Sequence, residues 1–366
     1  IAPLMSFVGS YVWKLRQALG SQRILVPGVA MLLVNNAGDW SHVYPWLEHA
    51  EWNGCTPADF IFPFFLFIVG VSLEFAVASK IATVASGTLW RSACWRAVKI
   101  FLLGVALHAI AMLLIPDRSF RLLGVLQRIG ICFLLASTAL IYLRSTLRLS
   151  ILCATTLLAY WLLLDATGAY LPNLNIVDRI DTVILGPLAY QFDAVTFQAR
   201  EPEGLLSSLP ATVNVLLGLV AARLLRKNQV VSLILLGIFL LVLGWLWSFL
   251  MPWNKQLWTS SFVCWTCGWA SILLAAFHYW VDQKQLPSLG LSFGVNAIIA
   301  YAGAWVATCV IAASNAMPHI YPQSVVQVFT RLGGESFASF VFALLFTISF
   351  GLMMYFLRRC GWRFSI

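Results

Sequence analysis

The chain has 366 residues, of which 61% are hydrophobic and only 10% are charged. Soluble proteins carry about 25% charged residues and could not bury this much apolar surface. The composition therefore excludes a soluble domain, a disordered chain and a small disulfide-linked scaffold. The mean hydropathy of +0.86 indicates that lipid surrounds most of the chain. The net charge is +9, and the positions of the charged residues along the chain decide how it is interpreted.

Apolar stretches long enough to cross a bilayer, about 20 residues each, recur along the whole chain. They predict an all-α, polytopic membrane protein with ten helices, at residues 22–38, 57–79, 92–115, 122–143, 148–165, 208–226, 229–250, 257–281, 288–314 and 336–358. We assign residues 1–21 to a separate N-terminal segment, amphipathic or part of the first span, and residues 22–366 to the membrane domain. Residues 166–207 are too polar and too interrupted by proline and glycine to span, so we expect a long loop there.

The charges of successive loops alternate in sign. The loops expected on one side of the membrane are strongly basic, whereas residues 39–56 and 166–207, on the other side, are acidic. The positive-inside rule places the basic side in the cytoplasm. Both termini are then cytoplasmic, which agrees with an even number of helices. The positive charge therefore reports membrane orientation and gives no reason to expect nucleic acid as a partner.

Three charged residues fall within the predicted spans, where each costs about 2.5–3.5 kcal/mol on insertion scales. Asp59 ends the run Thr56-Pro57-Ala58-Asp59, which is typical of a helix N-cap followed by proline, so it has either a capping or a functional role. Glu74 lies near the cytoplasmic end of the same helix, where we expect its side chain to snorkel to the surface. Arg128, beside Gln127, is expected to line a polar cavity or to bridge to a carbonyl or carboxylate.

The densest cluster of polar residues lies between Asn35 and Asp59, at the outer end of the first two spans. It contains His49, a residue type whose protonation changes near neutral pH and which suits work as a general base or nucleophile. A histidine in a loop is also often merely exposed. Asn35 is either a helix cap or a donor to an oxyanion. The histidines show no metal-ligand spacing, so we expect no metal site.

This cluster resembles a known family of membrane enzymes. The pattern His49-Ala50-x-Trp52-Asn53-Gly54-x-Thr56-x-x-Asp59-x-x-Phe62-Pro63-x-Phe65-x-Phe67-Ile68-x-Gly70 is similar to the heparan-α-glucosaminide N-acetyltransferase family, and Asn35-Asn36-x-Gly38-Asp39-Trp40 resembles its bacterial members. Further similar blocks are Gly124-Val125-Leu126-Gln127-Arg128-Ile129-Gly130, Asp178-Arg179, Pro202-Glu203-Gly204-Leu205-Leu206, Asn254-Lys255-x-Leu257-Trp258-x-Ser260 and Gly294-x-Asn296 with Tyr301. The stretch 20–25 departs from the family, because it lacks the usual Leu-Asp-x-x-Arg-Gly.

The resemblance implies transfer of an acetyl group from cytoplasmic acetyl-CoA to a glucosamine-type amine on the far side of the membrane. His49 matches the catalytic histidine of the family and Asn35 its active-site asparagine. We expect contacts with the donor from Arg128, Gln127, Lys255 and Asn296. We expect contacts with the acceptor from Asn53, Asp59, Asp178, Glu203 and Trp52. Whether His49 acts as a base or itself carries the acetyl group stays open at this point.

The expected location is the bacterial inner membrane, crossed many times. The expected partners are acetyl-CoA, an amino sugar and the lipid bilayer, and the resemblance leaves a homodimer open. The alternative function is an inner-membrane transporter of an amino sugar or N-acetylglucosamine. Transporter sites usually lie near the bilayer midplane, whereas this polar cluster lies at one mouth of the bundle, which favours the enzyme.

Overall fold

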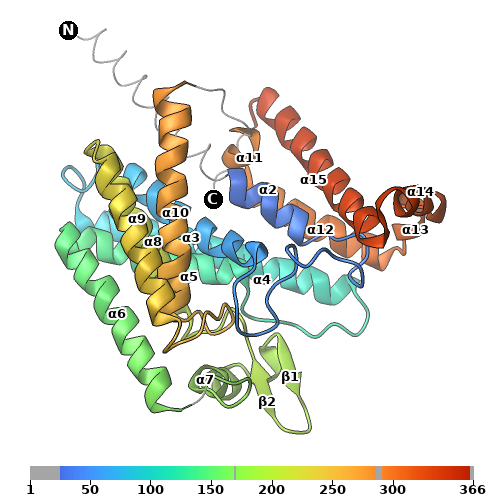
Figure 1. Cartoon of the computed structure of the whole chain (residues 1–366), viewed down its shortest axis with the longest axis horizontal. Helices are drawn as coiled ribbons and strands as arrows, with labels where there is room; N and C mark the ends of the chain where they lie inside the picture. Colours follow the sequence, from blue (N-terminus) through green and yellow to red (C-terminus); the bar gives the residue numbers. More distant parts are fainter. Residues whose placement is uncertain (1–24, 169, 286–290, 363–366) are drawn as a thin grey trace.

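The computed structural model describes residues 25–168, 170–285 and 291–362, so the predicted segment 1–21 lies outside the described residues. Within them the chain is a bundle of helices, as expected (Figure 1). The first half contains α2 (Leu25–Val34), the 3-10 helix η1 (Pro57–Phe60), α3 (Ile61–Val77), α4 (Ser86–Leu114), α5 (Val125–Leu143) and α6 (Thr146–Ala166). The second half contains α8 (Ser208–Arg226), α9 (Val230–Trp247), α10 (Ser260–Phe277) with the π-helix η3 (His278–Gln283), α11 (Leu291–Val295), α12 (Ala297–Ala313), α13 (Met317–Ile320), α14 (Gln323–Gly333) and α15 (Glu335–Arg359).

Eight helices in the described part of the chain are long and apolar enough to cross a membrane. Their spans correspond to eight of the ten that the sequence predicts. The expected span at 22–38 corresponds to α2, which is described from Leu25. The expected span at 288–314 is interrupted at Asn296 and continues as the shorter apolar helix α12. The protein is therefore a multi-pass, all-α membrane protein.

The long loop at 166–207 folds on itself without spanning, as expected. It contains α7 (Ile176–Ile184), the 3-10 helix η2 (Gly186–Leu188) and a hairpin of β1 (Gln191–Asp193) and β2 (Gln198–Arg200). The two strands are antiparallel, with Phe192 opposite Ala199. Figure 1 shows this unit at one end of the bundle.

Small residues allow the central helices to approach closely. A methyl group on Gly70 of α3 would collide with the backbone of Val215 in α8, and one on Gly218 of α8 with the backbone of Phe67 in α3. Lipid does not drive helices together, so such close backbone contact is a main source of association in a membrane. The large hydrophobic core is built around this pair. A smaller core joins α2, α11, α12 and α15 through Leu32, Phe293, Ala300, Ala304, Phe350 and Met354.

Glu74 corrects one expectation at the end of α3. Its carboxylate is only 3% exposed and pairs with Arg223 Nε at 3.1 Å and Arg226 Nη1 at 2.8 Å. The prediction that it snorkels to the surface is therefore wrong. Two arginines 149 and 152 residues away in the sequence satisfy it inside the bundle, and the hydropathy of its own helix gave no indication of them.

Candidate active site

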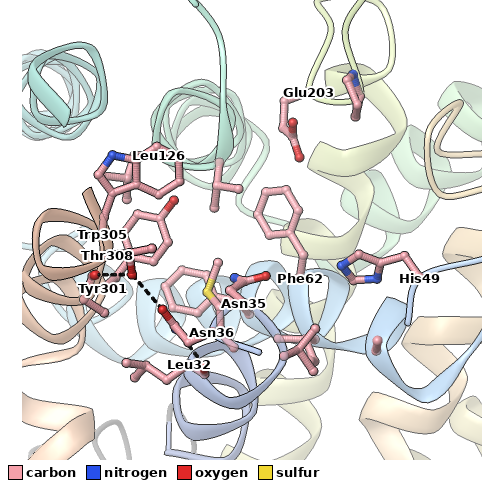
Figure 2. Close-up of a pocket in the computed structure, with 18 of the residues that line it drawn as sticks. Leu32, Asn35, Asn36, His49, Phe62, Leu126, Glu203, Tyr301, Trp305 and Thr308 are labelled. Carbon is pink, nitrogen blue, oxygen red and sulfur yellow. Dashed lines mark hydrogen bonds between the residues drawn. The ribbon is translucent and has the colours of Figure 1, made fainter. Parts of the chain in front are cut away.

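A cavity of about 580 Å³ opens between the end of α2, the start of α3 and α5, and one face of α12. Asn35, His49, Glu203 and Lys255 lie among its lining residues together with Tyr301. Figure 2 shows Asn35, His49, Glu203 and Tyr301 around the same open space. The lining is mostly apolar, and the polar groups concentrate near the loops that contain His49 and Glu203. The structure thus brings together four of the predicted site residues from distant parts of the chain.

A buried carboxylate orients His49. His49 Nδ1 lies 2.8 Å from Asp59 Oδ1, and the carboxylate of Asp59 is 1% exposed. The second oxygen, Oδ2, accepts hydrogen bonds from the backbone amides of Ala50 at 3.1 Å and Thr56 at 3.0 Å. The capping box that the run Thr56–Asp59 predicts is present, with Pro57 in the first turn. One aspartate therefore both caps the helix and holds the histidine ring, which leaves Nε2 for other partners.

Lys255 approaches the same histidine from the loop between α9 and α10. Its Nζ lies 3.0 Å from His49 Nδ1, 3.2 Å from His49 Nε2 and 3.4 Å from Asp59 Oδ1. Burial lowers the pKa of Lys255, against the opposing pull of Asp59 and Glu203. The loop is rigid because Asn254 Oδ1 accepts from Leu257 N at 2.8 Å, and Asn254 Nδ2 donates to Asn53 Oδ1 at 3.1 Å. Lys255 thus supplies a cation that pairs with the buried carboxylate.

The two adjacent asparagines at the end of α2 differ in burial and in hydrogen bonding. Asn36 is buried, donates to Leu32 O at 2.7 Å and accepts from Thr308 Oγ1 at 2.7 Å. Asn35 is exposed at the cavity, and within the described residues its side chain makes no hydrogen bond. Asn36 therefore fixes α2 against α12, and the amide of Asn35 is left to meet a ligand (Figure 2).

An ion cluster forms part of the cavity wall. The guanidinium of Arg121 pairs with both Glu201 and Glu203 and stacks 4.6 Å from the centre of the Tyr190 ring. Desolvation raises the pKa of Glu203, but the positive charges of Arg121, Arg128 and Lys255 outweigh it, and the net pKa is lowered. Glu203 is therefore ionised at neutral pH and holds a negative charge at the cavity wall.

Three of the residues predicted to contact the donor do not line the cavity. Arg128 is fully buried, donates to Ser207 Oγ and to Gly204 O, and stacks 4.9 Å from the centre of the Trp258 ring. Gln127 is also fully buried and donates to Leu122 O at 2.9 Å. Asn296 is buried at the break between α11 and α12, where its Nδ2 lies 3.3 Å from Trp362 O.

Four of the residues predicted to contact the acceptor are likewise absent from the cavity wall. The carboxylate of Asp59 faces His49, as described above. Asp178 accepts from Asn173 N at 2.7 Å and from Asn175 Nδ2 at 2.8 Å, and so holds in place Asn175, the residue that caps α7. Trp52 donates from Nε1 to Tyr170 O at 2.6 Å, and Asn53 is bound by Asn254. These groups hold the outer loops to one another.

The cavity wall also contains residues that the sequence did not single out as site residues. They are Arg118, Arg121, Tyr301, Trp305 and Thr308. Arg118 stacks 5.4 Å from the centre of the Trp305 ring, and Trp305 Nε1 donates to Leu107 O at 3.1 Å. In the sequence the two arginines count only as loop charges, and the residues that their guanidinium groups contact lie at least 69 residues away. The position of Tyr301 within a family-like block was the one indication available.

Comparison with known proteins shows the family of this chain. The model of the heparan-alpha-glucosaminide N-acetyltransferase catalytic family matches residues 28–235, more than half of the chain. The chain belongs to this family. It is 26% identical to the human heparan-alpha-glucosaminide N-acetyltransferase and 28% identical to the mouse protein, each over 340 residues that cover 75% of this chain and 51% of the relative. The chain thus spans about half the length of these curated relatives.

The region that matches the heparan-alpha-glucosaminide N-acetyltransferase family contains Asn35, His49, Asp59 and Glu203. Lys255 and the wall formed by α12 lie beyond it, yet they complete the same cavity. The cavity therefore depends on parts of the chain both inside and outside the matched region.

Proposed function

We propose that this chain transfers an acetyl group from acetyl-CoA to the amine of a glucosamine-type sugar. The observation that carries the proposal is His49, held by the buried Asp59 and lining the cavity together with Asn35, whose amide makes no hydrogen bond within the described residues. The family to which the chain belongs supports the same reaction class. We infer that the protein works in the inner membrane of a bacterium, with its His49 end outward, because the loops at the opposite end are basic.

His49 acts as the general base. An amine attacks only when its nitrogen carries a lone pair, so a base must take a proton from it. Asp59 accepts the hydrogen bond from Nδ1, which leaves Nε2 to receive that proton, as in the histidine–carboxylate pairs of hydrolases. Proton transfer of this kind contributes roughly 10²–10⁴-fold to a rate. In this assignment Asp59 positions His49 and does not contact the acceptor.

Asn35 stabilises the negative charge that develops during the transfer. The amine nitrogen forms a bond to the thioester carbon, and the carbonyl oxygen becomes an oxyanion. The amide nitrogen of Asn35 donates a hydrogen bond to that oxygen. The intermediate then collapses as the C–S bond breaks, and its electron pair leaves on the CoA sulfur. The nitrogen gives up two protons between ammonium and amide: His49 passes the first to solvent before the attack, then takes the second from the nitrogen of the intermediate and returns it to this thiolate. The products are an N-acetyl sugar, free CoA and one proton.

The cavity accommodates the two substrates from different directions. It follows α12 from Ala312 to Ala297, about 22 Å at 1.5 Å per residue. Its apolar walls suit the pantetheine arm of a donor that comes from the basic side, where Asn296 adjoins Ala297. At the other end, the ionised Glu203 attracts the ammonium form of the acceptor before His49 deprotonates it. Arg128 and Gln127 support this wall from behind without direct contact.

The first test is acetyl transfer by the purified full chain in detergent, with radiolabelled acetyl-CoA and glucosamine. We expect label on the sugar with the wild type and a loss of at least roughly 100-fold with His49→Ala. His319 is exposed and does not line the cavity, so His319→Ala is the matched control.

Two other results would change the proposal. Label that stays on the wild-type protein without sugar would assign the acetyl group to His49 itself, as in a two-step transfer. No transfer to any amino sugar, together with sugar uptake into proteoliposomes without CoA, would replace the enzyme by a transporter.

A further inference from the structure

A second cavity, of about 390 Å³, lies at the opposite end of α3 and α8. Its lining residues are Glu74, Ala78, Ile81, Arg144, Thr146, Arg223, Arg226 and Lys227. It shares none of them with the cavity that contains His49. On α3 the deepest lining residue of the first cavity is Phe65, nine residues or about 13 Å before Glu74. The two cavities are thus separate sites at opposite ends of the bundle.

The charges of this second cavity do not balance. Its wall carries four cationic side chains and one carboxylate, that of Glu74. Glu74 accepts from Arg223 and Arg226, but each guanidinium has five N–H donors and only some of them are used. The side chain of Arg226 is 44% exposed, and Lys227 is exposed beside it. The cavity therefore presents several unused donors and an excess of positive charge to whatever enters.

Apolar side chains next to this cavity are exposed on the surface of the helix bundle. Tyr142, Leu147 and Val231, close in sequence to lining residues, are 55%, 69% and 71% exposed. In a multi-pass membrane protein, exposed apolar side chains at helix ends contact lipid. A ligand that fits both features has an anionic head for the arginines and an apolar tail for this surface. A soluble phosphate compound would use only the first feature.

We propose that this cavity binds the phosphate of an anionic phospholipid, through Arg144, Arg223, Arg226 and Lys227. Basic pockets between membrane helices on the cytoplasmic side are suited to such head groups, and the positive-inside rule puts this end there. The phosphate takes the unused guanidinium and ammonium donors, and Glu74 keeps two of the arginines in place. The acyl chains lie against Tyr142, Leu147 and Val231. Lipid binding at this site does not require acetyl transfer, so this proposal does not depend on the proposed enzyme activity.

Native mass spectrometry of the purified full chain tests this directly. Phosphatidylglycerol is added in steps, with phosphatidylcholine as the zwitterionic comparison. We expect preferential, saturable binding of phosphatidylglycerol. Arg226→Gln and Lys227→Gln should each weaken it roughly five-fold, because one basic residue near a membrane surface contributes about 1 kcal/mol. Glu74→Gln should strengthen it, because the amide oxygen can still accept from the arginines while the one negative charge of the wall is removed.

Arg148→Gln is the matched control, since Arg148 is exposed at the same end of the bundle but does not line the cavity. Equal binding of both lipids, or an equal loss with Arg148→Gln, would overturn the site. CoA and inorganic phosphate are added in separate arms. If either binds without lipid as tightly as phosphatidylglycerol does, and loses affinity in the Arg226 and Lys227 variants, the cavity belongs to a soluble phosphate ligand and the lipid assignment is wrong.

Discussion

Two histidine–aspartate pairs lie close together in the first loop, and burial separates their roles. His42 Nδ1 lies 2.8 Å from Asp39 Oδ2, the same distance that separates His49 from Asp59. The carboxylate of Asp39 is 54% exposed, however, whereas that of Asp59 is 1% exposed. A hydrogen bond to a buried carboxylate holds a ring far more firmly, because water does not compete for it. The outer pair instead ties the loop to Glu335 at the start of α15.

Asp59→Asn should remove the carboxylate that orients the His49 ring and sets its tautomer, while the ring itself stays. The amide has a similar size, but it can donate to Nδ1 and so favour the wrong tautomer. We expect kcat for acetyl transfer to fall by roughly 10²-fold or more, with little change in KM. Steady-state kinetics of the purified protein measures this. Asp39→Asn is the control and should retain activity; an equal loss in both variants would show that Asp59 serves only the fold.

At the scale of elements, the loop at 166–207 contains a buried aspartate whose ionised form is disfavoured by desolvation. Asp181 in α7 is fully buried, and although Leu205 N donates to its Oδ1 at 3.2 Å, desolvation raises the pKa of Asp181 to about 7. Gly204 packs directly on this carboxylate, and no side chain would fit there. The folded loop thus binds a proton more tightly than the unfolded chain does, whose aspartate has a pKa near 3.9.

The stability of this loop should therefore fall as the pH rises. Asp181 favours the folded state most below about pH 4, and this contribution disappears as the pH passes about 7, where the buried carboxylate ionises. Asp181→Asn imitates the protonated form. We expect it to match the wild type near pH 4, to gain Tm over the wild type progressively as the pH rises, and to keep the full difference above pH 7, as measured by thermal unfolding in detergent. Asp165→Asn, at an exposed position, should show no such difference; equal Tm values for Asp181→Asn and the wild type at pH 8 would contradict the assignment.

At the scale of the whole molecule, the two ends of the bundle carry different chemistry. The loops that contain His49, Arg121, Glu203 and Lys255 meet at one end, although up to 206 residues separate them. Glu74 and its arginines mark the opposite end of α3. These loops are the alternate ones whose charges the sequence analysis assigned to opposite sides of the membrane. The fold and the charge pattern thus divide the chain in the same way.

Labelling with a membrane-impermeant thiol reagent checks which end faces outward. Cys360 is exposed, and Cys55 and Cys94 are half-buried, so all three are first replaced by alanine. Glu51→Cys in this background should react in intact cells, because Glu51 is exposed in the loop of His49. Restored Cys360 should react only after the membrane is opened. The reverse pattern would invert the proposed orientation.

The sequence predicted most of the architecture because its information is local. Hydropathy located the helices, and proline and glycine at 166–207 marked the loop that does not span. The capping pattern at Thr56–Asp59 was also readable, because its hydrogen bonds join residues three positions apart.

The site was predictable only where a family motif or a local pattern marked it. Four of the predicted residues line the cavity: Asn35, His49, Glu203 and Lys255. The predicted residues Asp59, Asp178 and Arg128 are buried away from it, so they cannot contact a substrate there. No local pattern separates Asn35 from Asn36, because their difference depends on Thr308, 272 residues away, and only the family resemblance singled out Asn35. The partners of Glu74 are also distant in the sequence, at 149 and 152 residues.

The cavity lies between the two hydrophobic cores of the molecule. One wall, with Phe62, Leu126 and Trp258, belongs to the large core; the facing wall, with Leu32 and Ala300, belongs to the small one. Moving the walls apart would uncover apolar surface mainly on the small core, at about 25 cal/mol per Å². The width of the cavity therefore depends on the small core, whereas the place of His49 depends on its hydrogen bond to Asp59 in η1, beside the large core. Acceptors of different girth should be tolerated far better than acceptors whose amine is displaced along the cavity.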